Sequence, residues 1–279
     1  MGLKIIALTG FTVQDLEILI ATMDRVDLGF LESMFSMPVS QIPLSLLVVN
    51  QSNTTTLKSV YPNIKVVNSD TYGLSKSRNI GLRESSKPLL LITDDDVVFK
   101  PNFASNVVVY FNNYPTAQVV LHKVIEGTVM RTYPEIGRIT DRDGLSGVGS
   151  IEISLKRNCL DLFELEFDEH LGLGTNLPLA EETLFIYQLF DKGAILHQSD
   201  ATITTHEHIS SGKRFIEEGV VEARAVLNHL VGKWPDWLWS LKYALWLSKN
   251  GYMNLVEAPT IMRRARRGIS SYRQSKRLQ

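Results

Sequence analysis

The first half of the chain alternates short, almost entirely apolar segments with segments of helical periodicity. Each apolar segment runs into polar or glycine-containing residues, which is typical of buried strands that lead into turns. The predicted strands cover residues 4–10, 44–50, 64–68 and 88–93.

Helices are predicted between these strands. Residues 12–15 have the spacing of a capping box, and the helix expected after them carries its apolar residues on one face. These residues are Leu16, Leu19, Ile20 and Met23. A further helix is predicted at residues 75–83. Apolar strands that alternate with helices predict a parallel sheet covered on both faces.

The second half continues this alternation and ends in helices. The expected elements are a helix at residues 102–114, a strand at 117–125, an irregular insertion at 126–149, a strand at 150–156, a loop at 172–178, a helix at 180–192, a strand at 194–205 that alternates like an exposed or edge strand, an amphipathic helix at 213–231 and a tryptophan-rich helix at 234–247. We therefore expect an α/β domain over residues 1–212 and a basic helical extension over residues 213–279, packed on that domain or associated with a membrane.

The composition is that of an ordinary globular protein. The chain has 279 residues, of which 44% are hydrophobic and 21% charged, and these values argue against a disordered or fibrous protein. No apolar run reaches the ~18 residues that a membrane-spanning helix needs, and the first residues do not resemble a cleavable signal. The single cysteine, Cys159, cannot form an internal disulfide, and we expect it to be buried. A cytoplasmic location is the simplest interpretation.

Charge is distributed unevenly along the chain. Residues 258–279 carry seven arginines and lysines and no acid, so the rest of the chain, whose total is −1, has a net charge near −8. A basic tail suggests attraction to an anionic surface, and together with the tryptophan-rich helix it resembles an interfacial membrane anchor. A solvated terminal helix is the alternative. No nucleic-acid partner is expected, because the acidic body offers no companion basic face.

Three adjacent carboxylates, Asp94, Asp95 and Asp96, follow the strand at residues 88–93. Crowded aspartates repel one another and need a cation or hydrogen bonds beside a core. The Asp-x-Asp spacing can direct Asp94 and Asp96 to the same side, where they would suit Mg²⁺ or Mn²⁺ and a diphosphate-bearing substrate. A solvated acidic turn is the alternative.

A second polar motif precedes the same strand, at residues 72–82. A Gly-Leu-Ser entry into a helix offers free backbone amides, and Lys76 and Arg78 add positive charge, so this segment could hold a phosphate or a nucleotide. A capped surface helix is the alternative. Because ligands bind beyond the carboxyl ends of parallel strands, residues 9–10, Asn50 and residues 94–96 could share one pocket.

The chain resembles family 2 glycosyltransferases of the GT-A fold. The resemblance covers residues 4–212 and rests on five segments in the family's order: residues 5–10, 48–52, 73–81, 93–97 and 180–185. It implies an α/β fold of the GT-A type, a Rossmann-like nucleotide-diphospho-sugar transferase fold, here followed by the helical extension.

The resemblance also implies roles for individual residues. Thr9, Gly10 and Asn50 would contact the nucleotide base, Arg78 and Asn79 correspond to the family's Arg-Asn pair, and Asp94 or Asp95 would reach the ribose or the sugar. The segment Asn50-Gln-Ser stands where the family usually has Asp-Asp-Gly-Ser, which alters the contact to the base, usually uracil. Asp96 would hold the divalent metal, Mn²⁺ or Mg²⁺.

Catalysis is assigned by the same resemblance to Glu181 and Glu182. Inverting members place a general base at the start of a late helix, and Glu182 is the candidate that accepts the proton of the attacking hydroxyl. The alternative is that both acids only favour the positive end of the helix dipole. His206 and His208 stand where the family often places a histidine near the metal or the diphosphate, although such histidines are also common on surfaces.

These expectations define an inverting glycosyltransferase. It would move a sugar from a metal-bound nucleotide diphosphate donor, UDP in most of the family, to a carbohydrate or lipid-linked saccharide, as in bacterial surface polysaccharide or O-antigen assembly. It would act in the cytoplasm, at the inner face of the membrane if the tail binds there. A non-catalytic GT-A-like partner or nucleotide-binding protein is one alternative. A sugar nucleotidyltransferase is another, but residues 9–14 lack the glycine-rich, basic loop it needs.

Overall fold

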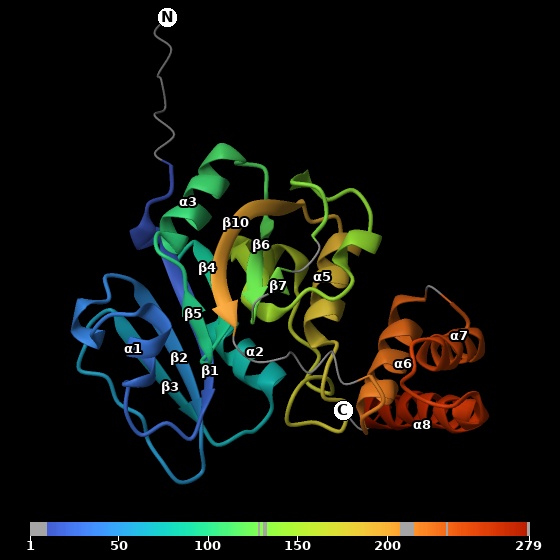
Figure 1. Cartoon of the computed structure of the whole chain (residues 1–279). Helices are drawn as coiled ribbons and strands as arrows, with labels where there is room; N and C mark the ends of the chain where they lie inside the picture. Colours follow the sequence, from blue (N-terminus) through green and yellow to red (C-terminus); the bar gives the residue numbers. More distant parts are fainter. Residues whose placement is uncertain (1–9, 128, 131–132, 207–214, 233, 278–279) are drawn as a thin grey trace, which may run out of the picture.

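The computed structural model describes residues 10–127, 129–130, 133–206, 215–232 and 234–277. Its centre is one mixed sheet with the strand order β3-β2-β1-β4-β9-β6-β10-β5 (Figure 1), and β7 and β8 pair with β6 and β10. The strands are β1 (Leu16–Met23), β2 (Ser45–Gln51), β3 (Ile64–Ser69), β4 (Leu89–Asp94), β5 (Val97–Phe99), β6 (Val119–Glu126), β7 (Val129–Met130), β8 (Gly137–Arg138), β9 (Ile153–Lys156) and β10 (Leu196–His206). The first four sheet neighbours, β3 to β4, are parallel.

Helices cover both faces of this sheet. They are α1 (Phe30–Phe35), α2 (Leu74–Glu84), α3 (Phe103–Asn113), α4 (Asn158–Phe163) and α5 (Glu181–Asp191). Residues of α1 and α3 share one core cluster with Ile18 and Ile20 of β1, whereas residues of α2, α4 and α5 share another with Leu19. Because neighbouring residues of a strand point to opposite faces, β1 is apolar at successive positions and is covered on both sides. Cys159 of α4 is buried in the second cluster, as expected.

Residues 16–23 form a strand, so the helix expected there is wrong. Leu16, Leu19, Ile20 and Met23 fit a helical period, but Ile18 is also fully buried, as a strand between two layers requires. The predicted capping box is present, yet it closes only the 3₁₀ turn η1 (Val13–Asp15). Of the strand predicted at residues 4–10, only Gly10 lies within the described residues, and it has no regular structure.

The other predicted elements of the sheet domain are present with two differences, whereas α1, β5 and α4 were not predicted. Residues 150–156 begin as a 3₁₀ turn, η4 (Ser150–Glu152), before β9. The strand at residues 194–205 is not an edge strand, because β10 pairs with β6 on one side and with β5 and β8 on the other. The insertion at residues 126–149 is largely irregular, with β7, β8 and the turn η3 (Asp143–Leu145).

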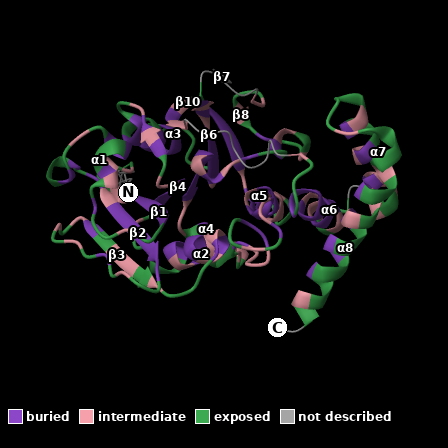
Figure 2. Ribbon diagram, turned by 60° about the horizontal axis from the view of Figure 1, so that its bottom comes forward, coloured by how far each residue is buried: buried purple, intermediate pink, exposed green. Residues whose placement is uncertain are grey.

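Three helices follow the sheet domain: α6 (Val220–Val231), α7 (Asp236–Lys249) and α8 (Ala258–Arg277), with the turn η6 (Leu255–Glu257) before α8. Figure 2 shows them beside α5, with α6 nearest to it. Helix α8 packs on α6 so closely that a Cβ atom at Gly268 would lie 2.6 Å from the Cβ atom of Glu222. The predicted boundary at residues 212–213 falls outside the described residues. Among the described residues, no helix is long and apolar enough to cross a bilayer.

Candidate active site

The carboxyl ends of β1, β2 and β4 lie along one edge of the sheet. In the parallel register, Thr22 pairs with Asn50 and Ala21 pairs with Asp94. This edge is where ligands bind in open α/β sheets. Since β1 is Leu16–Met23, the first strand end at this edge is Thr22 rather than the predicted residues 9–10.

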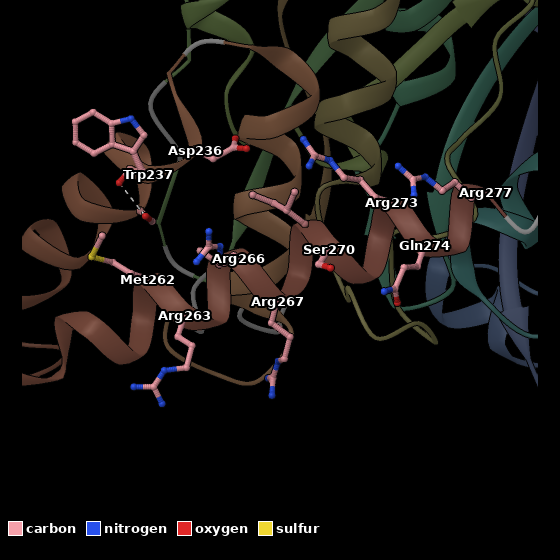
Figure 3. Close-up of a pocket in the computed structure, with 13 residues that line it drawn as sticks. Asp236, Trp237, Met262, Arg263, Arg266, Arg267, Ser270, Arg273, Gln274 and Arg277 are labelled. Carbon is pink, nitrogen blue, oxygen red and sulfur yellow. Dashed lines mark hydrogen bonds between the residues drawn. The ribbon is translucent and has the colours of Figure 1, made fainter.

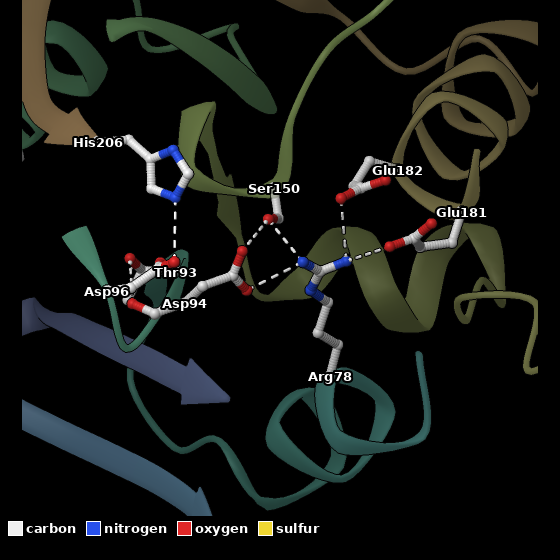
Figure 4. Close-up of polar contacts among 8 residues, drawn as sticks. All are labelled: Arg78, Thr93, Asp94, Asp96, Ser150, Glu181, Glu182 and His206. Carbon is white, nitrogen blue, oxygen red and sulfur yellow. Dashed lines mark hydrogen bonds and ion pairs between the residues drawn. The ribbon is translucent and has the colours of Figure 1, made fainter. Parts of the chain in front are cut away.

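Arg78 is the centre of the polar contacts at this edge (Figure 4). Its side chain, from α2, is only 2% exposed. One terminal nitrogen donates to Glu181 Oε1 at 2.9 Å and to Glu182 Oε1 at 3.2 Å. The other donates to Asp94 Oδ1 at 3.0 Å and to Ser150 Oγ at 2.6 Å, and Ser150 donates to Asp94 Oδ2 at 3.2 Å. Arg78 therefore joins the end of β4 to the first turn of α5.

The pKa values of Arg78 and Glu181 are both shifted by their surroundings in this cluster. Burial lowers the pKa of Arg78, but the negative charges of Asp94, Glu182 and Glu181 outweigh it and hold the pKa above the ordinary value. Burial, with help from Glu182, raises the pKa of Glu181 to about 8, although Arg78 opposes the shift. The guanidinium thus stays charged, and the buried Glu181 carboxyl favours its neutral form.

Glu181 and Glu182 consequently differ in what they can do. The side chain of Glu181 is 3% exposed and one of its oxygens, Oε2, has no hydrogen-bond partner among the described residues, whereas the side chain of Glu182 is 18% exposed. A general base must come within hydrogen-bond reach of the proton that it accepts. Glu182 is the carboxylate that a bound substrate can reach, and Glu181 orients Arg78.

Two residues with positive φ, Ala180 and Gly172, lie next to the start of α5. Ala180, immediately before Glu181, has φ = 83° in the left-handed region, which non-glycine residues rarely adopt. Gly172 has φ = 98°, and a Cβ atom there would lie 3.0 Å from Glu181 Cδ and from Ser75 Oγ. The loop at residue 172 therefore needs glycine, because it lies directly against the Glu181 carboxyl group.

Asn79 does not face this edge. Its side chain is fully buried, donates to the carbonyl of Phe167 at 2.9 Å and to Glu169 Oε1 at 3.1 Å, and accepts from the Phe167 amide at 2.8 Å. These bonds fix the segment that leads towards α5. The contact of Asn79 with the donor therefore stays a prediction, and its observed partners are all within the protein.

Asp95 turns away from Arg78 towards the end of β1. It accepts hydrogen bonds from Thr22 Oγ1 and from Arg25, whose Nε and Nη2 lie 3.0 Å and 2.7 Å from Asp95 Oδ2. Asn50 is fully buried and holds the same turn, since its Oδ1 accepts from the Arg25 amide at 3.0 Å. The predicted base and ribose contacts, Asn50 and Asp95, therefore lie together around Arg25.

Asp96 pairs with His206 instead. β5 and β10 pair with Val97 opposite His206, which brings His206 Nε2 to 3.1 Å from Asp96 Oδ2. The Asp96 side chain is 44% exposed. An exposed carboxylate beside an imidazole fits a divalent ion that takes its other ligands from a diphosphate and water. Asp94, by contrast, is engaged by Arg78, and within the described ranges no three acidic, histidine or cysteine side chains are placed to hold a metal ion together.

Three predicted positions remain. Thr9 and His208 lie outside the described residues. Gly10 precedes η1 and lies against Asn112 of α3, at the amino end of β1, so the reason for expecting a base contact there is lost.

Sequence reasoning missed three residues of the site, Thr22, Arg25 and Ser150. A helix over residues 16–23 has no strand end at Thr22, so that prediction placed neither Thr22 nor Arg25 at the site. The polar run after the apolar segment, Thr22 to Arg25, was the signal that could have revealed a strand end. Ser150 carried no such signal, because its contact with Arg78 bridges 72 positions of sequence.

Comparison with known proteins agrees with this geometry. Residues 50–162 match the sequence profile described as "Glycosyl transferase family 2". This segment contains Arg78 and the three aspartates. No curated protein sequence matches the chain.

Solved structures of S. aureus TarS share the fold. TarS 1–349 in complex with UDP-GlcNAc is 15% identical with a TM-score of 0.56, covering 93% of this chain and 92% of that chain. TarS 1–349 in complex with UDP is 16% identical with a TM-score of 0.50, covering 93% and 91%. A further TarS structure, 15% identical with a TM-score of 0.50, matches 84% of this chain, which spans only 43% of that one.

The family match and the fold together define the class. The protein has the GT-A fold with a helical C-terminal region, and residues 50–162 are similar to family 2 of the glycosyltransferases, a family of enzymes.

Proposed function

We propose that the protein is an inverting glycosyltransferase that moves a sugar from a uridine diphosphate donor to a hydroxyl group of a saccharide. The observation that carries this proposal is the contact of Arg78 with both Asp94 and Glu182, which brings the acidic end of β4 and the first turn of α5 to one point. The fold likeness to a protein solved with UDP-GlcNAc supports the choice of donor.

The proposed reaction needs one base and stabilisation of one leaving group. The acceptor oxygen attacks the anomeric carbon, its proton passes to Glu182, and the bond from that carbon to the diphosphate oxygen breaks with its electron pair leaving on the diphosphate. Glu182 lies in the first turn of α5, and its side chain is partly exposed. Arg78 orients Glu182 and supplies fixed positive charge close to the reacting groups.

Asp96 and His206 are the residues that would hold a divalent cation, Mn²⁺ or Mg²⁺. When bound, such an ion neutralises charge on the departing diphosphate. Asp96 fits this role better than Asp94, because the Asp94 carboxylate is taken by Arg78 and Ser150. Around Arg25, Asp95 and Asn50 would form the base and ribose side of the donor site.

The acceptor that we propose is a carbohydrate or a lipid-linked saccharide used in bacterial surface polysaccharide assembly at the inner face of the membrane. The arginine-rich helix α8 supports this part, because basic helices are attracted to anionic membrane surfaces and α8 is bonded to the sheet domain. Tyr272 donates to Asp168 Oδ2 at 2.6 Å, next to the segment that Asn79 holds.

Donor binding and turnover test the proposal separately. Thermal unfolding with UDP, GDP and UDP-sugars, with and without Mn²⁺, should show a selective rise in midpoint with a uridine ligand, since ligands that bind the folded state stabilise it. Donor hydrolysis, in which water replaces the acceptor, should then fall by at least about 10²-fold in Glu182→Gln while the thermal shift remains. A folded protein that binds no nucleotide would favour the non-catalytic alternative, and full activity in Glu182→Gln would rule out the assigned base.

The metal assignment has its own test. Asp96→Asn and His206→Ala should each weaken the Mn²⁺ dependence of UDP binding by about tenfold or more, by titration of Mn²⁺ at fixed UDP. Asp143→Asn, an exposed acid in the turn η3, is the matched control and should titrate like the wild type. Equal Mn²⁺ titrations for all four proteins would refute the site.

A further inference from the structure

A large cavity lies away from the Arg78 cluster. It is an open groove of about 1150 Å³ between α7 and α8 (Figure 3), lined by arginines of α8 and by Asp236, Trp237 and Ser240 of α7. Nothing in the proposed reaction uses this groove.

The arginines form one face of α8. Five of them are exposed and lie within an arc of about 120° at 100° per residue. They are Arg263, Arg266, Arg267, Arg273 and Arg277. The opposite face, with Ile261, Ala265 and Ile269, is buried against the other helices. The arginine face is therefore held outward by the packing of α8.

Several of these charges lack an ion-pair partner within the described residues. Arg267 binds Glu222 at 2.9 Å, and Arg273 contacts His229 at 3.2 Å. Arg263, Arg266 and Arg277 have no such contact there, and helix α8 itself contains no acidic residue. Three arginines on one face of α8 without an ion pair among the described residues favour an anionic ligand.

Apolar side chains border the same groove. Trp237 and Met262 line it, and Trp237 is 63% exposed. Trp234, which directly precedes α7, is 40% exposed, and Leu245 of α7 is 47% exposed. Tryptophan is enriched at membrane interfaces, where its ring meets both lipid chains and head groups. A soluble anion would need only the arginines. The exposed tryptophan beside them therefore favours a membrane surface as the ligand.

We propose that the groove and the arginine face of α8 bind the surface of an anionic phospholipid bilayer, with arginines on the lipid phosphates and Trp237 of α7 at the acyl boundary. The charge of α8 and the exposed apolar side chains of α7 together match this surface better than a soluble polyanion. The inference does not depend on the proposed transfer reaction, because vesicle binding requires no turnover.

Vesicle sedimentation of the full chain tests the inference. The protein should pellet with vesicles of phosphatidylcholine and phosphatidylglycerol, hardly at all with phosphatidylcholine alone, and far less at roughly 1 M salt, where charges are screened. Arg263→Gln/Arg266→Gln should lower the partition coefficient about thirtyfold, since each surface arginine contributes about fivefold. Lys58→Gln/Arg138→Gln removes the same charge from exposed positions of the sheet domain and should bind like the wild type.

Tryptophan emission supplies a second measurement. All four tryptophans lie within residues 234–246, so their emission reports this segment alone. Anionic vesicles should shift it to shorter wavelength, and Trp237→Ser should weaken vesicle binding although every arginine remains. Equal binding to both lipid mixtures, or wild-type binding by Arg263→Gln/Arg266→Gln, would overturn the proposal. Binding of soluble polyphosphate without binding of vesicles would also overturn it and assign the surface to a free polyanion.

Discussion

Glu181→Gln isolates the effect of a carboxyl group that is buried beside two other acids. Glutamine keeps an oxygen that can accept from Arg78 Nη1, as Glu181 Oε1 does at 2.9 Å, but it cannot ionise. The variant therefore removes the titration of residue 181 while preserving its size and its main hydrogen bond.

The sign of the pH effect follows from the direction of the pKa shift. The pKa of Glu181 rises from an ordinary value of 4.5 to about 8 in the folded protein, chiefly because of burial. Between these values the folded state holds a proton that the unfolded state has lost, so the free energy of unfolding falls as pH rises. One such proton contributes at most about 1.4 kcal/mol per pH unit. Between pH 5 and pH 7 the wild type should lose up to about 3 kcal/mol relative to Glu181→Gln.

Urea unfolding at a series of pH values measures this difference. The two proteins should have similar stability near pH 5, and the variant should be increasingly the more stable one towards pH 8. Glu166→Gln, which changes an exposed glutamate paired with Arg83, should follow the wild type throughout. A difference between wild type and Glu181→Gln that stays constant from pH 5 to pH 8 would refute the argument that the folded protein holds Glu181 neutral.

Two further predictions concern the packing around the site and the extension. Arg78→Met leaves Asp94, Glu181 and Glu182 without their shared cation and should cost about 3–5 kcal/mol of stability by urea unfolding at pH 7, where a loss below 1 kcal/mol would contradict the cluster. Gly268→Ala should destabilise the protein by about 1–3 kcal/mol, because its Cβ atom would meet α6, whereas Ser270→Ala on the exposed side of α8 should have little effect. Equal stability of the two α8 variants would argue against the close approach of the helices.

The three adjacent aspartates show how the fold resolves a conflict that is visible in the sequence. Each carboxylate has a different partner: Asp94 meets Arg78, Asp95 meets Arg25, and Asp96 meets His206. These partners come from α2, from the turn after β1 and from β10. The expectation that such a cluster needs compensation was sound, but the compensation comes from three protein side chains as well as any bound ion.

The strand β1 shows why the local hydrophobic pattern was not enough to distinguish a strand from a helix at residues 16–23. Residues 16–23 have apolar positions at both helical and alternating spacing, because a strand covered on two faces is apolar at most positions. Only the pairing of β1 with β2 and β4 distinguishes the two interpretations. The error moved the predicted strand end from Thr22 to residues 9–10 and so concealed Arg25.

Residue order alone was enough for the α/β class, most of the strands and helices, and the segments at residues 73–81, 93–97 and 180–185 that resemble a glycosyltransferase. These features depend on neighbours along the chain, through periodicity, turns and motif spacing. Which acid meets Arg78, which glutamate stays buried and which arginines of α8 remain unpaired depend on contacts between distant segments. Such contacts follow from strand order and helix packing, which bring together groups as far as 104 positions apart. The pattern of neighbouring residues does not predict them.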